Sequence, residues 1–324
     1  MNYIVLDLEW NQSPDGKAGE VPGFPFEIFE IGAVKLNEKR EYVDRFSCYI
    51  KPGVYKELHH IIKELTHVSM QTLNKEGVCF NHAISSFFEW CQKDGDYIFC
   101  TWGTTDMLEL QRNMRHFEYK SPMAFPLYFY DVQKLFSMAC EDGKIRRSLE
   151  NVAQMLDINM QRDFHSAIND ALYTAEVMKS FDFDMVKQYF SIDTYYIPAD
   201  KSKEIKVNYG TYYKYVSRGF ESKEDAMADR EVQSTRCYIC NKNARKKIRW
   251  FATNTKVHYC LSECKAHGLL KGRLRVREDE FGNFYAIKII KQTNEDGALG
   301  IKQKQLEIRK KRRERRAKEK MNKG

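Results

Sequence analysis

The chain has 324 residues, about twice the usual length of a single domain, and 43% of them are hydrophobic, which is enough for a folded core and excludes a largely disordered protein. The N-terminal residues MNYIVLDLEW lack the basic segment and small-residue cleavage site of a signal peptide, and no run of eighteen apolar residues occurs, so neither secretion nor membrane insertion is expected. The net charge is +8, but residues 302–324 hold twelve Lys or Arg against three Glu and contribute +9, which places the basic character in an appendage on a nearly neutral body.

Nine cysteines are scattered along the chain. An odd number of cysteines without a signal peptide indicates buried thiols and a metal site rather than a disulfide framework. A reducing, cytoplasmic location is therefore expected.

The N-terminal region has the pattern of a β-sheet. Residues 3–8, 27–36 and 42–50 are apolar, rich in β-branched residues, and separated by polar or turn-forming stretches. They predict three strands in an antiparallel meander.

Helical patterns follow the meander, with a further short strand predicted at 97–101. Apolar residues recur at helical spacing in 54–65, 81–93, 105–117, 131–140, 149–156 and 167–180. Strands first, then mixed strands and helices, indicate an α/β fold in which helices flank a mixed sheet.

The chain divides into four segments by pattern. Residues 1–182 hold the sheet and its helices, and residues 183–232 have no clear periodicity and are interpreted as a connector. Residues 233–295 contain four cysteines and a strand-like segment, and residues 296–324 form the basic tail.

Asp7 and Glu9 are two residues apart on the first predicted strand. Side chains at this spacing point to the same face of a sheet, so both carboxylates face one cleft. Two like charges side by side are costly to bury unless a cation neutralises them. The pair therefore favours a divalent-metal site, although an exposed pair beyond the strand end remains an alternative.

Three more polar residues lie at the ends of predicted elements. Asp106 begins a predicted helix after the strand 97–101. The alternative to a metal-binding role is a structural one, since an Asp in the first turn is favoured by the helix dipole. His165 and Asp170 are five residues apart, which is about 140° around a continuous helix. They converge only if His165 lies in the loop that enters the helix of Asp170. For His165 alone, a structural role is the alternative.

This set of residues resembles the DEDDh group of 3′-to-5′ exonucleases, the superfamily of RNase T, the DNA polymerase III proofreading subunit and exoribonucleases related to the histone-mRNA 3′ exonuclease. The resemblance rests on Asp7-Leu8-Glu9 with Glu30 to Ala33, on Trp102 to Leu110 around Asp106, and on His165 to Ala167 with Asp170-Ala171. It covers about residues 1–182 and implies an RNase H-like fold.

The resemblance also implies a mechanism. Asp7, Glu9, Asp106 and Asp170 would hold two Mg²⁺ or Mn²⁺ ions, and His165 would act as general base on the attacking water, because an imidazole pKa near 6.5 suits that role. The products would be nucleoside 5′-monophosphates. Trp10 stands where the family more often has a small residue or threonine, and it is a candidate for stacking on substrate.

The second half of the chain contains a predicted zinc site. Cys237 and Cys240, followed after nineteen residues by Cys260 and Cys264, have the paired spacing of a structural zinc centre with four cysteine ligands. The module is similar to a zinc ribbon or treble-clef finger. His258 and His267 are alternatives for one of the ligands.

The sequence thus predicts a metal-dependent exonuclease acting on single-stranded nucleic acid, with RNA favoured. A DNA-directed exonuclease is the alternative within the same chemistry. A catalytically weak nucleic-acid-binding or ribosome-associated adaptor is the alternative from another class. The complete set Asp7, Glu9, Asp106, His165 and Asp170 favours the enzyme.

Overall fold

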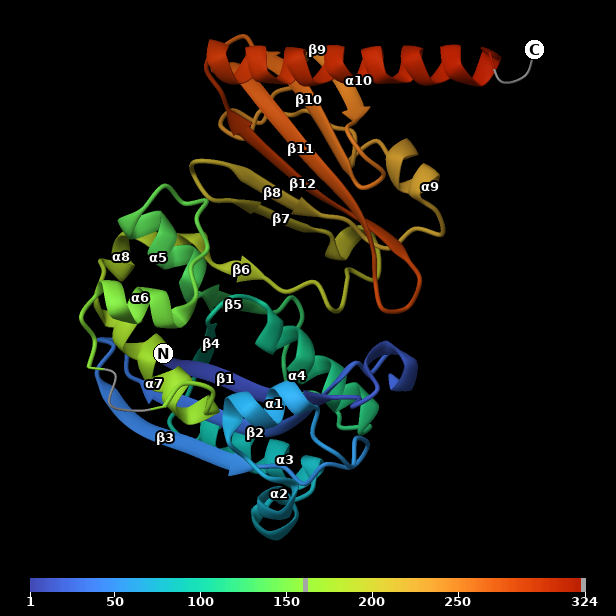
Figure 1. The fold of residues 1–324 in the computed structure, drawn as a ribbon. Helices are drawn as coiled ribbons and strands as arrows, with labels where there is room; N and C mark the ends of the chain where they lie inside the picture. Colours follow the sequence, from blue (N-terminus) through green and yellow to red (C-terminus); the bar gives the residue numbers. More distant parts are fainter. Residues whose placement is uncertain (160–162, 322–324) are drawn as a thin grey trace. The chain divides into compact units, whose positions relative to one another are not determined.

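The computed structural model describes residues 1–159 and 163–321. The chain forms two compact units, Met1–Thr194 and a second unit that begins at Tyr195. Each unit contains one six-stranded sheet with helices packed on it (Figure 1).

The sheet of the first unit has the strand order β3-β2-β1-β4-β5-β6. Its strands are β1 (Asn2–Gln12), β2 (Phe26–Leu36), β3 (Tyr42–Tyr49), β4 (Tyr97–Thr101), β5 (Tyr128–Asp131) and β6 (Ser191–Ile192). The first three strands pair antiparallel, as predicted for the meander, and β1, β4 and β5 pair in parallel. The central strand β1 therefore joins both halves of a mixed sheet.

Helices cover both faces of this sheet (Figure 1). They are η1 (Gly16–Gly19), α1 (His60–Thr66), α2 (Met70–Glu76), α3 (Phe80–Gln92), α4 (Thr105–His116), α5 (Val132–Cys140), α6 (Leu149–Met155), α7 (Ala167–Lys179), α8 (Phe183–Val186) and η2 (Lys187–Tyr189). The even-numbered β1 residues Ile4, Leu6 and Leu8 are buried in one core with α3 and α4, while α7 packs on β1 and β2. The α/β architecture with helical cover agrees with the predicted fold class.

The helix predicted at 54–65 begins only at His60. The buried carboxylate of Glu27 accepts hydrogen bonds from the backbone N–H groups of Gly53, Val54 and Tyr55. The three amides converge on one side chain, which holds this segment in a turn against β2. The start of α1 is shifted beyond the turn for this reason.

The sheet of the second unit has the order β7-β8-β12-β11-β10-β9, and neighbouring strands pair antiparallel. Its strands are β7 (Ile205–Asn208), β8 (Tyr213–Val216), β9 (Arg245–Ala252), β10 (Val257–Cys264), β11 (Gly268–Glu278) and β12 (Phe284–Gln292). Its helices are η3 (Lys201–Lys203), α9 (Lys223–Ala228) and α10 (Glu295–Met321). This sheet is larger than the small zinc module that the cysteine spacing predicts.

The prediction that residues 183–232 form a connector is wrong. Residues 183–192 continue the first unit through α8 and β6, and residues 195–232 supply β7, β8 and α9 to the second. Val232 is fully buried in a core with Leu274 and Val276. The sequence pattern misses β7 and β8 because each strand is only four residues long, too short to show a clear alternation.

The predicted tail at 296–324 begins as a packed helix. Ala298 and Ile301 of α10 are buried against Ile248 and Leu261 of the sheet. Beyond them α10 is mainly exposed as far as its side chains are described, and residues 322–324 lie outside the described part. No helix in the described ranges is long and apolar enough to cross a membrane.

Candidate active site and zinc centre

The first cluster lies on the β1–β2 pair. Asp7 and Glu9 alternate with the buried core residues of β1, so both point to the face on which α7 packs. Asp7 is opposite Gly32 of β2, and Glu9 is opposite Glu30. The pairing with β2 shifts register between Glu9 and Trp10 and then continues to Gln12.

Gly32 and Glu30 bring α7 close to these carboxylates. A Cβ atom at Gly32 would overlap the backbone of Ala167 and Ile168 in the first turn of α7. Glu30, only 2% exposed, accepts a hydrogen bond of 3.2 Å from the Ser166 hydroxyl and further bonds from the backbone of Ala167 and Ile168. Glu30 therefore caps the N-terminus of α7 and ties it to β2.

His165 lies in the loop just before α7, with a left-handed backbone conformation (φ 64°). Its backbone N–H donates to Asp170 Oδ2 at 3.2 Å. Potential ligand atoms of Glu9, His165 and Asp170 all lie within 4.8 Å of one another. The loop position of His165 is the one that the five-residue spacing to Asp170 requires.

Asp106 joins the cluster from the other side of β1. It lies in the first turn of α4, directly after β4, and is 5% exposed. Its Oδ1 accepts a hydrogen bond of 3.3 Å from the backbone N–H of Leu8, between Asp7 and Glu9. The parallel pairing of β1 and β4 thus places the start of α4 beside Leu8 of β1.

The carboxylates raise one another's pKa values. Burial, followed by the charge of Asp106, holds the pKa of Asp7 well above its usual range. Burial and then the charge of Asp170 raise the pKa of Glu9 to about 8. Burial raises the pKa of Asp106 to about 7 and that of Asp170 to about 6. At neutral pH this cluster cannot hold all its negative charges without a compensating cation.

The cluster fits hard divalent cations. Its donors are carboxylate oxygens, the ligands that Mg²⁺ and Mn²⁺ prefer. Asp170 Oδ1 is buried without a hydrogen-bond partner in the described chain. Four carboxylates could hold two such ions, with His165 beside them.

Trp10 follows the register shift on β1 and is partly buried. Its ring contacts that of Phe26 with centroids 5.9 Å apart and packs against the core of the first unit. Part of the Trp10 side chain is therefore buried by packing inside the first unit, and the rest is exposed.

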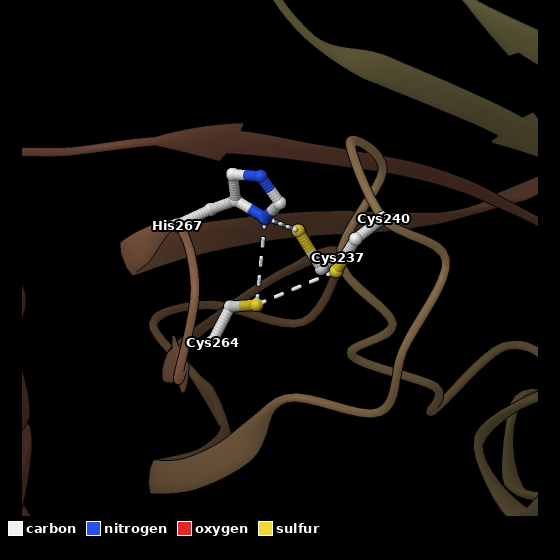
Figure 2. Close-up of side chains that lie close together, drawn as sticks. All are labelled: Cys237, Cys240, Cys264 and His267. Atoms are coloured by element: carbon white, nitrogen blue, oxygen red, sulfur yellow. Dashed lines mark hydrogen bonds between the residues drawn. The ribbon is translucent and has the colours of Figure 1, made fainter.

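The second cluster is in the second unit (Figure 2). It consists of Cys237, Cys240, Cys264 and His267, whose potential ligand atoms lie within 4.8 Å of one another. The distance from Cys240 Sγ to Cys264 Sγ is 3.6 Å, and His267 Nδ1 is 3.6 Å from Cys237 Sγ and 3.7 Å from Cys264 Sγ. Ligands about 2.0–2.3 Å from a tetrahedral Zn²⁺ are separated by about these distances.

Cys260 is not part of this cluster, which corrects the predicted set of four cysteine ligands. Cys260 and Cys264 are on the same strand, so their Cα atoms are about 13 Å apart, too far for both thiolates to bind one ion. Cys260 is instead fully buried, and burial raises its pKa to about 12.

His267 replaces Cys260 because it lies in the turn after β10. The signal was present in the sequence: Cys264 and His267 have the same two-residue separation as Cys237 and Cys240. Backbone N–H groups of Ala266 and His267 donate to the Cys264 thiol and lower its pKa to about 6, so the turn favours the thiolate that zinc requires.

Comparison with known proteins gives a match to one family profile. The profile describes an exonuclease, RNase T, and covers residues 4–178, which is more than half the chain. No curated protein matches.

Several solved structures are similar to this chain. The nuclease domain of 3′hExo, a DEDDh family member bound to rAMP, is 20% identical, with a TM-score of 0.48, covering 59% of this chain and 96% of that one. Cell-death related nuclease 4 is 16% identical, with a TM-score of 0.47, covering 59% and 65%. Exonuclease I is 13% identical, with a TM-score of 0.49, covering 81% and 55%.

Proposed function

The chain belongs to the RNase T exonuclease family, as its DEDDh residues predict, and on this basis we propose that it removes nucleotides from the 3′ end of single-stranded nucleic acid. The products are nucleoside 5′-monophosphates. RNA is placed ahead of DNA as substrate because the motifs resemble exoribonucleases, and DNA is the alternative.

One observation carries this proposal. Residues distant in the sequence converge at the end of β1, where His165 and Asp170 lie within 4.8 Å of Glu9, and Asp106 is bound to the backbone between Asp7 and Glu9. A structural role does not explain so many mutually repelling, buried carboxylates, since each raises the free energy of the folded chain at neutral pH.

Each residue of the cluster has a role in the proposed reaction. Asp7, Glu9, Asp106 and Asp170 would hold two divalent cations, which stabilise negative charge on the attacking and leaving oxygens of a phosphodiester. His165 removes a proton from the attacking water, and its exposed position leaves room for substrate. Glu30 and Ser166 position His165 and Asp170 by fixing the start of α7.

Substrate contacts are proposed for Trp10. Its position immediately after Glu9, at the register shift, places an aromatic ring near the end of the carboxylate cluster. A ring there could stack on a base near the 3′ terminus without selecting a sequence.

The site in the second unit is proposed to bind one structural Zn²⁺. Cys237, Cys240, Cys264 and His267 form a closed donor set, and a closed set of this kind stabilises a fold rather than activating water. It would join the β10–β11 turn to the loop before β9.

The test is a time course with full-length protein, Mg²⁺ and 5′-labelled RNA and DNA of matched sequence. Stepwise shortening from the 3′ end is expected, and Asp7→Ala should abolish it. Asp96→Ala is the matched control, because Asp96 is an exposed carboxylate in the loop before β4. The relative rates decide between RNA and DNA, and binding without shortening in Mg²⁺ or Mn²⁺ would support the adaptor instead.

A further inference from the structure

The two units differ strongly in charge. The second unit, from Tyr195 onward, has 33 Lys or Arg against 16 Asp or Glu, a net charge of +17. The first unit has 20 against 29, a net charge of −9. Residues 195–301 alone carry +8, so the excess is not confined to the tail. The net charge of the first unit opposes the approach of a polyanion, whereas that of the second unit favours it.

One face of the second sheet presents arginines. Along β11, Leu270, Gly272, Leu274 and Val276 are buried. The intervening Arg273, Arg275 and Arg277 are partly or fully exposed and so lie on the opposite face. The zinc cluster packs with Leu270 and Ile290 on the buried face, so it does not obstruct these arginines.

Among the described residues, the three arginines lack acidic partners. Among the side chains that the structure describes, which leave out residues 160–162, 316 and 319–324, no ion pair involves Arg273, Arg275 or Arg277. Arg273 Nε is buried without a hydrogen-bond partner in the described part of the chain. Burial, followed by the charges of Arg273 and Arg277, lowers the pKa of Arg275. An anion bound along this row would relieve the repulsion between the guanidinium groups and accept charge-assisted hydrogen bonds from them.

Aromatic side chains flank the row on the same face. Arg273 of β11 is opposite Tyr259 of β10, and Tyr259 is in turn opposite Phe251 of β9. Both rings are partly exposed, and both pack beside the buried Ala298 and Ile301 of α10. Lys304 of α10 lies 4.7 Å from the centre of the Tyr259 ring, so the basic helix packs on the part of this face that carries the two rings.

We propose that this arginine face, defined as Arg273, Arg275, Arg277, Tyr259 and Phe251, binds the backbone and bases of a single nucleic-acid strand. Alternate residues of a strand are about 6.7 Å apart, similar to successive phosphates of an extended strand. The exposed parts of the Tyr259 and Phe251 rings can contact unpaired bases, which a duplex hides. The identification of this strand as substrate rests on the proposed exonuclease function.

The test measures binding and cleavage separately. Binding of a labelled, unstructured strand of about 30 nucleotides is followed by fluorescence anisotropy in the Asp7→Ala background, over a range of salt concentrations. The variant is R273Q/R275Q/R277Q in full-length protein. The matched control K201Q/K203Q/R230Q removes the same charge from exposed positions outside this face. A charge-preserving triple lysine variant, R273K/R275K/R277K, separates charge from folding.

The expected result is about a tenfold or greater loss of affinity in the glutamine variant, and a salt dependence reduced by about 2 in log K against log salt. The control and the lysine variant should stay within about threefold. With Asp7 intact, cleavage of an oligonucleotide of about five nucleotides should be unchanged, whereas a subsaturating long strand should be degraded more slowly.

The proposal fails if the glutamine variant keeps its affinity, if the control loses as much, or if a duplex or an acidic polypeptide is bound in preference to the single strand. If the protein binds the strand through these arginines but cleaves no substrate, the proposed exonuclease function is refuted. The proposal that the arginine face binds a single strand would still hold.

Discussion

Replacing Glu9 by glutamine is expected to stabilise the metal-free protein while it abolishes activity. The structure describes no hydrogen bond to the Glu9 side chain, so the amide loses no partner among the described residues. Ionised Glu9 is unfavourable because it is largely buried beside Asp170, Glu30 and Asp106, which raises its pKa to about 8. The substitution removes that charge.

The size of the effect follows from the pKa. Raising a carboxyl pKa from 4.5 to about 8 corresponds to about 4–5 kcal/mol against the ionised form at high pH. Protonation of neighbouring carboxylates relieves part of this repulsion, so we expect about 2 kcal/mol of stabilisation, or a rise in Tm of about 4–8 °C.

The pH dependence has a defined sign. Folded Glu9 binds its proton more tightly than unfolded Glu9, so the stability of the wild type falls as pH rises from about 4.5 to about 8. The difference in Tm between Glu9→Gln and wild type should therefore be small near pH 4.5 and largest near pH 8. Mg²⁺ should raise the Tm of the wild type and reverse the order of the two proteins.

Thermal unfolding in buffer freed of Mg²⁺, with and without added Mg²⁺, measures all three effects. Glu38→Gln is the matched control, because Glu38 is an exposed carboxylate outside the cluster. A metal-free Glu9→Gln protein that is less stable than wild type at pH 8 would contradict the electrostatic account of this cluster.

The remaining predictions concern other residues. His165→Ala should lower kcat about a hundredfold or more, yet retain the Mg²⁺-induced rise in Tm; loss of that rise would make His165 a ligand instead. Gly32→Ala should displace the start of α7 and abolish most activity, and activity close to that of wild type would refute this tight packing. His267→Ala should reduce bound zinc, measured by mass spectrometry of metal content, from about one ion per chain to almost none. Cys260→Ala should leave zinc content unchanged, and zinc loss in that variant would reject the corrected ligand set.

The sequence predicted the first unit well because its signals are local. β4 begins and ends at the predicted residues, and the start of α7 leaves His165 in the preceding loop. Glu30 and Gly32 belong to a recognised motif, but their roles depend on α7, which is distant in sequence. The cap from Glu30 to Ser166 joins residues 136 positions apart, and no local pattern reveals such a contact.

The second unit was predicted less well for two physical reasons. The proposed zinc ligands Cys264 and His267 come from the end of β10 and the turn that follows it. The spacing of the cysteines alone favours Cys260 instead, but its position within the strand makes it a core residue. The strands β7 and β8 are each four residues long, too short to show a clear alternation. Their place in the sheet is decided by pairing of β8 with β12, a segment distant in sequence.

The charge distribution favours hydrolysis in the first unit and binding of the nucleic-acid strand in the second. Buried carboxylates that bind cations are needed for phosphodiester hydrolysis, but with a net charge of −9 the first unit opposes the approach of its own substrate. Adding arginines next to Asp7 and Glu9 would improve attraction but would also compete with the cations for these carboxylates. Placing Arg273, Arg275 and Arg277 in a separate unit avoids that competition. Screening by salt should consequently weaken the capture of long strands far more than the cleavage of short ones.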